Sequence, residues 1–180
     1  MDLTEKQISA AYLYRGKVVS LRVDEAELPN GRHAKREVVE HNGGVCVVPL
    51  TDQNEILMVE QFRYPYGEVV LEIPAGKREG TEPPLECGIR ELREETGATA
   101  EQFTFLGELY PSPGYCGEII YMYLATGLRF GESMPDEDEF LHLKRIPLEQ
   151  AVEMILKGGI KDAKTQTAIL KVAMERMTQK

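Results

Sequence analysis

The chain has 180 residues, of which 42% are hydrophobic and 28% are charged, and its formal net charge is −9. These values predict one globular domain with a packed core, and they exclude a disordered or fibrous protein. The negative charge repels polyphosphate and anionic lipid, so neither nucleic acid nor a membrane is an expected partner. No apolar run approaches the roughly 18 residues of a membrane span, and the chain start lacks a signal-peptide pattern, so we expect a cytoplasmic protein.

Short β-rich runs occupy the first half of the chain. Residues 17–28 and 32–41 flank Pro29-Asn30-Gly31, and Asn-Gly between such runs predicts a hairpin. A type I′ turn is expected there, which needs positive φ at both Asn30 and Gly31. Further strands are predicted where apolar runs are bounded by turn residues, at 45–50, 55–61 and 69–73.

One helix follows these strands. Pro83-Pro84 suit its beginning, because the first turn leaves N–H groups unpaired, and Gly97 suits a left-handed cap at its end. Strands are predicted next at 103–110, 118–126 and 139–146, followed by helices at 148–157 and 163–177. Strands on both sides of one central helix predict an α/β sandwich with a mixed or mostly antiparallel sheet.

The predicted central helix carries closely spaced acids. At about 100° per residue, one apolar stripe is predicted to face the core, formed by Leu85, Ile89, Leu92 and Thr96. The arc away from the core carries Arg90, Glu91, Glu94 and Glu95. Like charges at this spacing repel by roughly 0.2–0.5 kcal/mol per pair on an isolated helix. The arc is either a solvated face neutralised by arginines or a site for Mg²⁺, which prefers carboxylates and water.

Residues 76–98, GKREGTEPPLECGIRELREETGA, resemble the Nudix box, G-x5-E-x7-R-E-U-x-E-E-x-G-U with U apolar. Every fixed position matches: Gly76, Glu82, Arg90, Glu91, Leu92, Glu94, Glu95, Gly97 and Ala98. The resemblance implies a Nudix-type α/β/α sandwich that hydrolyses a nucleoside diphosphate linked to another group, with Mg²⁺ as cofactor and Mn²⁺ as a substitute. It also implies specific roles: metal ligation by Glu91, Glu94, Glu95 and the Ala75 carbonyl, orientation of a ligand glutamate by Arg90, and an outer metal contact by Glu82.

Outside this box the chain resembles the ADP-ribose pyrophosphatase branch of the family. The similar stretches are residues 36–41, 59–65, 71–77 and 112–114, and Pro113 lies where that branch carries a proline. The resemblance implies cleavage of ADP-ribose to AMP and ribose 5-phosphate by a homodimer. In one domain spanning 1–180, it implies an N-terminal β extension at 1–42, used at the dimer interface, and a catalytic core at 43–180.

Further site candidates lie outside the box. Arg63 is a candidate to bind the substrate's phosphates, because a guanidinium offers two parallel donors, although an exposed strand-end arginine is the alternative. Arg36 and Glu37 are candidates of the same kind. For the catalytic base, the resemblance points to Glu139 or Glu137, although a solvated acidic loop also explains both residues. Glu118, which follows SPGYCG, is a third choice.

Two other functions remain as alternatives. One is a pyrophosphatase for another nucleoside diphosphate sugar, such as GDP-mannose or UDP-glucose, because related branches share the QFR sequence. The other is a Nudix module that senses ADP-ribose without catalysis. The intact box argues against the second alternative, and so does the lack of a recognisable basic, winged DNA-binding domain after residue 147.

Overall fold

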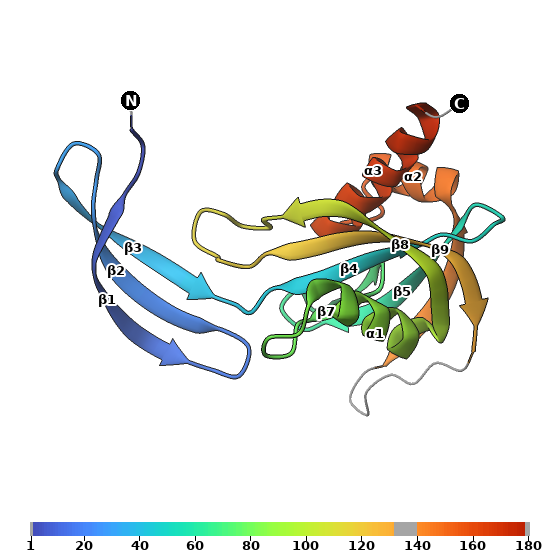
Figure 1. Ribbon diagram of the computed structural model, residues 1–180, viewed down its shortest axis with the longest axis horizontal. Helices are drawn as coiled ribbons and strands as arrows, with labels where there is room; N and C mark the ends of the chain where they lie inside the picture. The colour runs from blue at the N-terminus through green and yellow to red at the C-terminus, as the bar shows by residue number, and fades with distance from the viewer. Residues whose placement is uncertain (1, 132–139, 179–180) are drawn as a thin grey trace. The chain divides into compact units, whose positions relative to one another are not determined.

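The computed structural model describes residues 2–131 and 140–178, and the chain divides into two compact units (Figure 1). The N-terminal unit comprises Met1–Gly43 and Tyr110–Ile119, and the core unit comprises Gly44–Leu109 and Ile120–Lys180. Within the described part of the chain, every helix is too short or too polar to cross a lipid bilayer.

The N-terminal unit contains an antiparallel sheet in the order β1-β2-β3. Its strands are β1 (Lys6–Arg15), β2 (Ser20–Glu27) and β3 (His33–Glu40). The β2–β3 hairpin is confirmed, whereas β1 was not among the strands predicted from the sequence pattern.

The predicted type I′ turn is wrong. Gly31 N donates to Leu28 O at 2.8 Å, and Gly31, with φ of 78°, is the turn residue with positive φ. Pro29 restricts its own φ to about −65°, which favours a type I turn that ends in a left-handed glycine.

The core unit contains two sheets. A four-stranded sheet has the order β7-β4-β9-β8, in which β4 and β9 are parallel and the other pairs are antiparallel. A three-stranded antiparallel sheet has the order β10-β5-β6. The predicted mixed sheet is therefore confirmed. The strands are β4 (Gly44–Pro49), β5 (Glu55–Arg63), β6 (Glu68–Glu72), β7 (Ala75–Lys77), β8 (Ala98–Leu109), β9 (Ile120–Phe130) and β10 (Leu141–Pro147).

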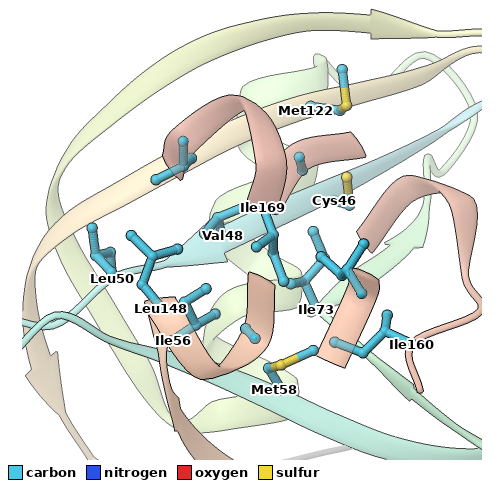
Figure 2. Close-up of a cluster of buried hydrophobic side chains, with 14 of the residues drawn as sticks. Cys46, Val48, Leu50, Ile56, Met58, Ile73, Met122, Leu148, Ile160 and Ile169 are labelled. Atoms are coloured by element: carbon cyan, nitrogen blue, oxygen red, sulfur yellow. The ribbon is translucent and has the colours of Figure 1, made fainter. Parts of the chain in front are cut away.

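The helices cover both faces of β4, as Figure 1 shows. They are α1 (Pro84–Thr96), α2 (Leu148–Leu156) and α3 (Ala163–Thr178). Cys46 and Val48 pack in one apolar cluster with residues of α2 and α3, including Leu148 and Ile169 (Figure 2). Val45 and Val47 pack in a second cluster with Cys87 and Leu92 of α1. Because successive side chains of a strand point to opposite faces, β4 is the shared middle layer, and the predicted α/β/α sandwich is confirmed.

Helix α1 begins and ends as predicted, but its buried face differs from the predicted one. Gly97 caps it with φ of 69°, and Gly97 N donates to Arg93 O. However, Leu85 and Ile89 of the predicted buried stripe are 40% and 44% exposed. The helix instead buries Gly88, where an added Cβ would lie 3.1 Å from Val45 Cγ1. The small side chain allows a close approach to β4, and this contact sets which helix face is buried.

Candidate functional site

Two of the predicted ligand glutamates lie on the buried face of α1, beside β7. Glu91 and Glu95 are only 8% and 5% exposed, which corrects the prediction that they lie on an arc away from the core. Ala75 N donates to Glu95 Oε2 at 3.2 Å. An added Cβ at Gly76 would lie 1.7 Å from Glu91 Oε1, so the Glu91 carboxylate occupies the space that the glycine leaves. The backbone of β7 therefore fixes the positions of both acids.

Arg90 connects the acids of this site. Its Nη1 donates to Glu91 Oε1 at 2.8 Å and to Glu94 Oε2 at 2.9 Å. Its Nε and Nη2 donate to the two carboxylate oxygens of Glu82 at 3.0 and 3.1 Å. These bonds raise the pKa of Arg90, the bond to Glu82 contributing most, and the bond from Arg90 lowers the pKa of Glu82 to about 2. One guanidinium thus holds three carboxylates together, and we call these four residues the Arg90 cluster.

The low pKa of Glu82 predicts a loss of stability in acid. Its ionised form is favoured by folding, so its contribution is present above the ordinary pKa of 4.5 and is lost as the pH falls toward about 2. We expect the free energy of unfolding of Glu82→Gln to fall less than that of the wild type between about pH 5 and about pH 3. Urea denaturation at both pH values measures this, with the exposed Glu86→Gln as a control. Equal pH dependence in Glu82→Gln and the wild type would contradict the prediction.

Arg63 lies in the core unit and is paired with an acid that the sequence analysis did not single out. Its Nε and Nη2 donate to Glu72 Oε1 and Oε2 at 2.6 and 2.7 Å, and the Glu72 side chain is only 3% exposed. The hydrogen bond to Glu72 contributes most to a raised pKa of Arg63, and the negative charges of Glu72, Asp162 and Glu95 raise this pKa further. A charged residue within the apolar run VVLEI was the available signal for Glu72.

The other candidates belong to the N-terminal unit or lie outside the described residues. Arg36, Glu37, Pro113 and Glu118 belong to the N-terminal unit. There, Arg36 binds Glu5 through two hydrogen bonds of 2.8 and 2.7 Å, Glu37 and Pro113 are exposed, and Glu118 Oε1 lies 3.3 Å from His41 Nδ1. Glu137 and Glu139 lie outside the described residues. The structure therefore brings together Ala75, Arg90, Glu91, Glu94 and Glu95 near β7, with Arg63 in the same unit.

Among residues 2–131 and 140–178, no group of three or more His, Cys, Asp or Glu side chains is gathered in a way that could hold a metal ion. In this structure the guanidinium of Arg90 supplies the positive charge that Glu91 and Glu94 share.

Two family models match the chain. Residues 40–167 match the family model described as NUDIX domain, and residues 5–39 match the one described as nucleoside diphosphate sugar hydrolase N-terminal domain. The ADP-ribose pyrophosphatase of Bacillus subtilis (strain 168) is 42% identical over 180 residues, which cover 99% of this chain and 97% of the relative. The methanol dehydrogenase activator of Bacillus methanolicus is 45% identical over 167 residues, which cover 92% and 90% respectively.

The solved crystal structure of an ADP compounds hydrolase is similar in fold. It aligns with a TM-score of 0.86 at 22% identity and covers 99% of this chain and 98% of that one. The family model spans more than two thirds of the chain and includes every residue of the Arg90 cluster. The chain therefore belongs to the Nudix hydrolase family.

Proposed function

We propose that this chain hydrolyses the diphosphate bond of ADP-ribose, giving AMP and ribose 5-phosphate. The observation that carries the proposal is the Arg90 cluster, in which carboxylates of α1 are held beside β7 where Gly76 makes room for them. The substrate is inferred from the relative named ADP-ribose pyrophosphatase, which is similar over nearly the full length of both chains.

Nudix hydrolases generally require a divalent metal ion. The described side chains are not gathered as metal ligands in this structure, but the residue types at this site suit a divalent ion. Glu91, Glu94 and Glu95 offer hard oxygen donors, and the space at Gly76 lets a carboxylate lie against the backbone of β7. We propose Mg²⁺ as the ion, with Mn²⁺ as a substitute, and the Ala75 carbonyl as a backbone ligand. When bound, a divalent ion neutralises diphosphate charge and lowers the pKa of bound water.

The chain's own residues position these groups. Arg90 is held by both oxygens of Glu82, so its guanidinium keeps its place when Glu91 and Glu94 turn toward another cation. Ala75 N fixes one oxygen of Glu95. Arg63 is proposed to bind the substrate's phosphates through its two parallel donors.

Other roles in the proposal follow the resemblance. Contacts to the substrate are assigned to Arg36, Glu37, Pro113 and Glu118, and the base is Glu139 or Glu137. We also propose a cytoplasmic homodimer in which residues 1–42 form the interface and 43–180 the catalytic core. Strand β1 is exposed at every position, so its surface is free to be covered by a second copy.

A substrate panel tests the function. The purified chain is assayed with ADP-ribose, GDP-mannose and UDP-glucose in Mg²⁺, and the products are identified by chromatography. We expect the highest kcat/KM for ADP-ribose, loss of turnover in excess EDTA, and recovery with Mg²⁺ or Mn²⁺. Faster turnover of GDP-mannose would contradict the substrate assignment, and binding of ADP-ribose without turnover would favour the sensing module.

A further inference from the structure

A buried ionic network links Arg63 to the beginning of α3. Lys164 Nζ donates to Glu72 Oε2 and lies 3.1 Å from Asp162 Oδ1. The Lys164 side chain is 12% exposed and that of Glu72 is 3% exposed. Because Arg63 binds both oxygens of the same carboxylate, Glu72 is shared by two cations. We call Arg63, Glu72, Asp162 and Lys164 the Glu72 network.

The backbone around this network is fixed at several points. Asp162 Oδ2 accepts from Thr165 N at 2.9 Å, and the fully buried Thr165 Oγ1 accepts from Ile73 N at 3.0 Å. Two residues beyond Ile73, Ala75 N donates to Glu95. The beginning of α3 is therefore connected through a short, hydrogen-bonded segment to the acids of α1.

The members of the network differ in their exposure to solvent. The Arg63 side chain is 36% exposed, whereas Glu72 and Lys164 are enclosed. Burial alone would raise the pKa of Glu72, but the hydrogen bond from Arg63 and the charge of Lys164 lower it, so Glu72 is ionised. Only Arg63 combines exposure to solvent with donors that can turn to a phosphate.

If Arg63 turns toward a diphosphate, it must give up bonds to a buried carboxylate. Removing one partner of a buried ion pair is strongly unfavourable when the other charge is left alone. Lys164 remains beside Glu72 after such a movement, since its side chain is only 12% exposed and it also lies 3.1 Å from Asp162 Oδ1. The second cation thus lowers the cost of the exchange.

We propose that Glu72 and Lys164 are positioning residues for diphosphate binding. Glu72 holds the Arg63 guanidinium in place before the substrate binds, and Lys164 neutralises Glu72 while Arg63 binds the substrate. This inference rests on the proposed function. It assigns a role to α3, which carries none of the residues of the Nudix box.

The test compares Lys164→Met with Lys161→Met in steady-state kinetics with ADP-ribose and Mg²⁺. Lys161 is the matched control, because it pairs with exposed Glu68 and its own side chain is 66% exposed. We expect Lys164→Met to raise KM roughly tenfold while kcat changes less than about threefold, since binding is weakened before and during the reaction alike. Lys164→Arg should restore part of the loss, and Lys161→Met should match the wild type.

A double-variant cycle separates positioning from a general structural role. In an Arg63→Ala background, Lys164→Met should raise KM no further, because it acts through Arg63. Additive effects on KM, or equal KM values for Lys164→Met and Lys161→Met, would overturn the inference. If Lys164→Met does not fold, the cycle is carried out with Glu72→Gln. No further rise in KM in the Arg63→Ala background then supports the inference, and additive effects on KM overturn it.

Failure of the proposed function gives a different result. A wild-type chain that does not hydrolyse ADP-ribose overturns that function before any variant is compared. In that case calorimetric titration of the same variants with ADP-ribose decides the positioning role, with a roughly tenfold weaker Kd for Lys164→Met as the expected result and an unchanged Kd as the contrary one.

Discussion

Glu95→Gln is expected to lower kcat for ADP-ribose hydrolysis by about 10²- to 10³-fold, the range for losing one group that stabilises developing charge. The amide keeps the size of the side chain, and its oxygen can still accept from Ala75 N. It lacks the negative charge that makes a carboxylate a stronger ligand for a divalent ion than a neutral oxygen. The Mg²⁺ concentration that gives half-maximal activity should therefore rise as well, which a metal titration measures.

The control for this variant is Glu86→Gln, at an exposed position on the same helix. It should retain wild-type kinetics. Glu95→Gln should also unfold in urea within about 1 kcal/mol of the wild type, because a neutral group at a buried position avoids the cost of burying a charge. Unchanged turnover in Glu95→Gln would remove the metal role from this residue.

The ends of α1 were predictable from sequence, whereas its orientation was not. Pro84 and Gly97 act through local backbone geometry, which the sequence alone determines. The buried face depends on what the helix packs against. A glycine contributes nothing to a hydrophobic stripe, because it has no side chain. Gly88 nevertheless lets α1 approach Val45 and Val47 closely. This tertiary contact leaves Leu85 and Ile89 exposed and encloses Glu91 and Glu95.

Strands β1 and β7 were not predicted from the sequence pattern, for different reasons. All ten residues of β1 are exposed, so no buried face imposes a clear alternation of polarity. Strand β7 has only three residues, fewer than a periodic pattern needs.

The site was predicted where its residues are close in sequence. Arg90, Glu91, Glu94 and Glu95 lie within one helix, and their spacing was sufficient to group them. Lys164 and Glu72 are 92 residues apart, and only the tertiary fold brings the beginning of α3 to the last residue of β6. A pair so far apart in the chain produces no local sequence pattern, apart from the charged Glu72 within an apolar run.

Gly76→Ala is expected to damage both stability and activity. Its Cβ would lie 1.7 Å from Glu91 Oε1 and 1.9 Å from Glu91 Cδ, so the carboxylate must leave its place against β7 and its bond to Arg90. Overpacking of this kind costs about 1–3 kcal/mol of unfolding free energy. Displacing a proposed metal ligand should also lower kcat/KM by about 100-fold, in line with the sensitivity of catalysis to misplaced groups. Urea denaturation and steady-state kinetics measure the two effects.

A shorter acid distinguishes this steric cause from a general requirement for glycine. Gly131→Ala serves as the control, because among residues 2–131 and 140–178 its added Cβ would meet Gly97 O at 3.4 Å, an ordinary contact distance. In the Gly76→Ala background, Glu91→Asp withdraws the carboxylate by one methylene and should recover part of the lost stability, although not the activity, since the ligand oxygen is then displaced. If Glu91→Asp recovers no stability in that background, the clash with Glu91 is not what makes glycine necessary at position 76.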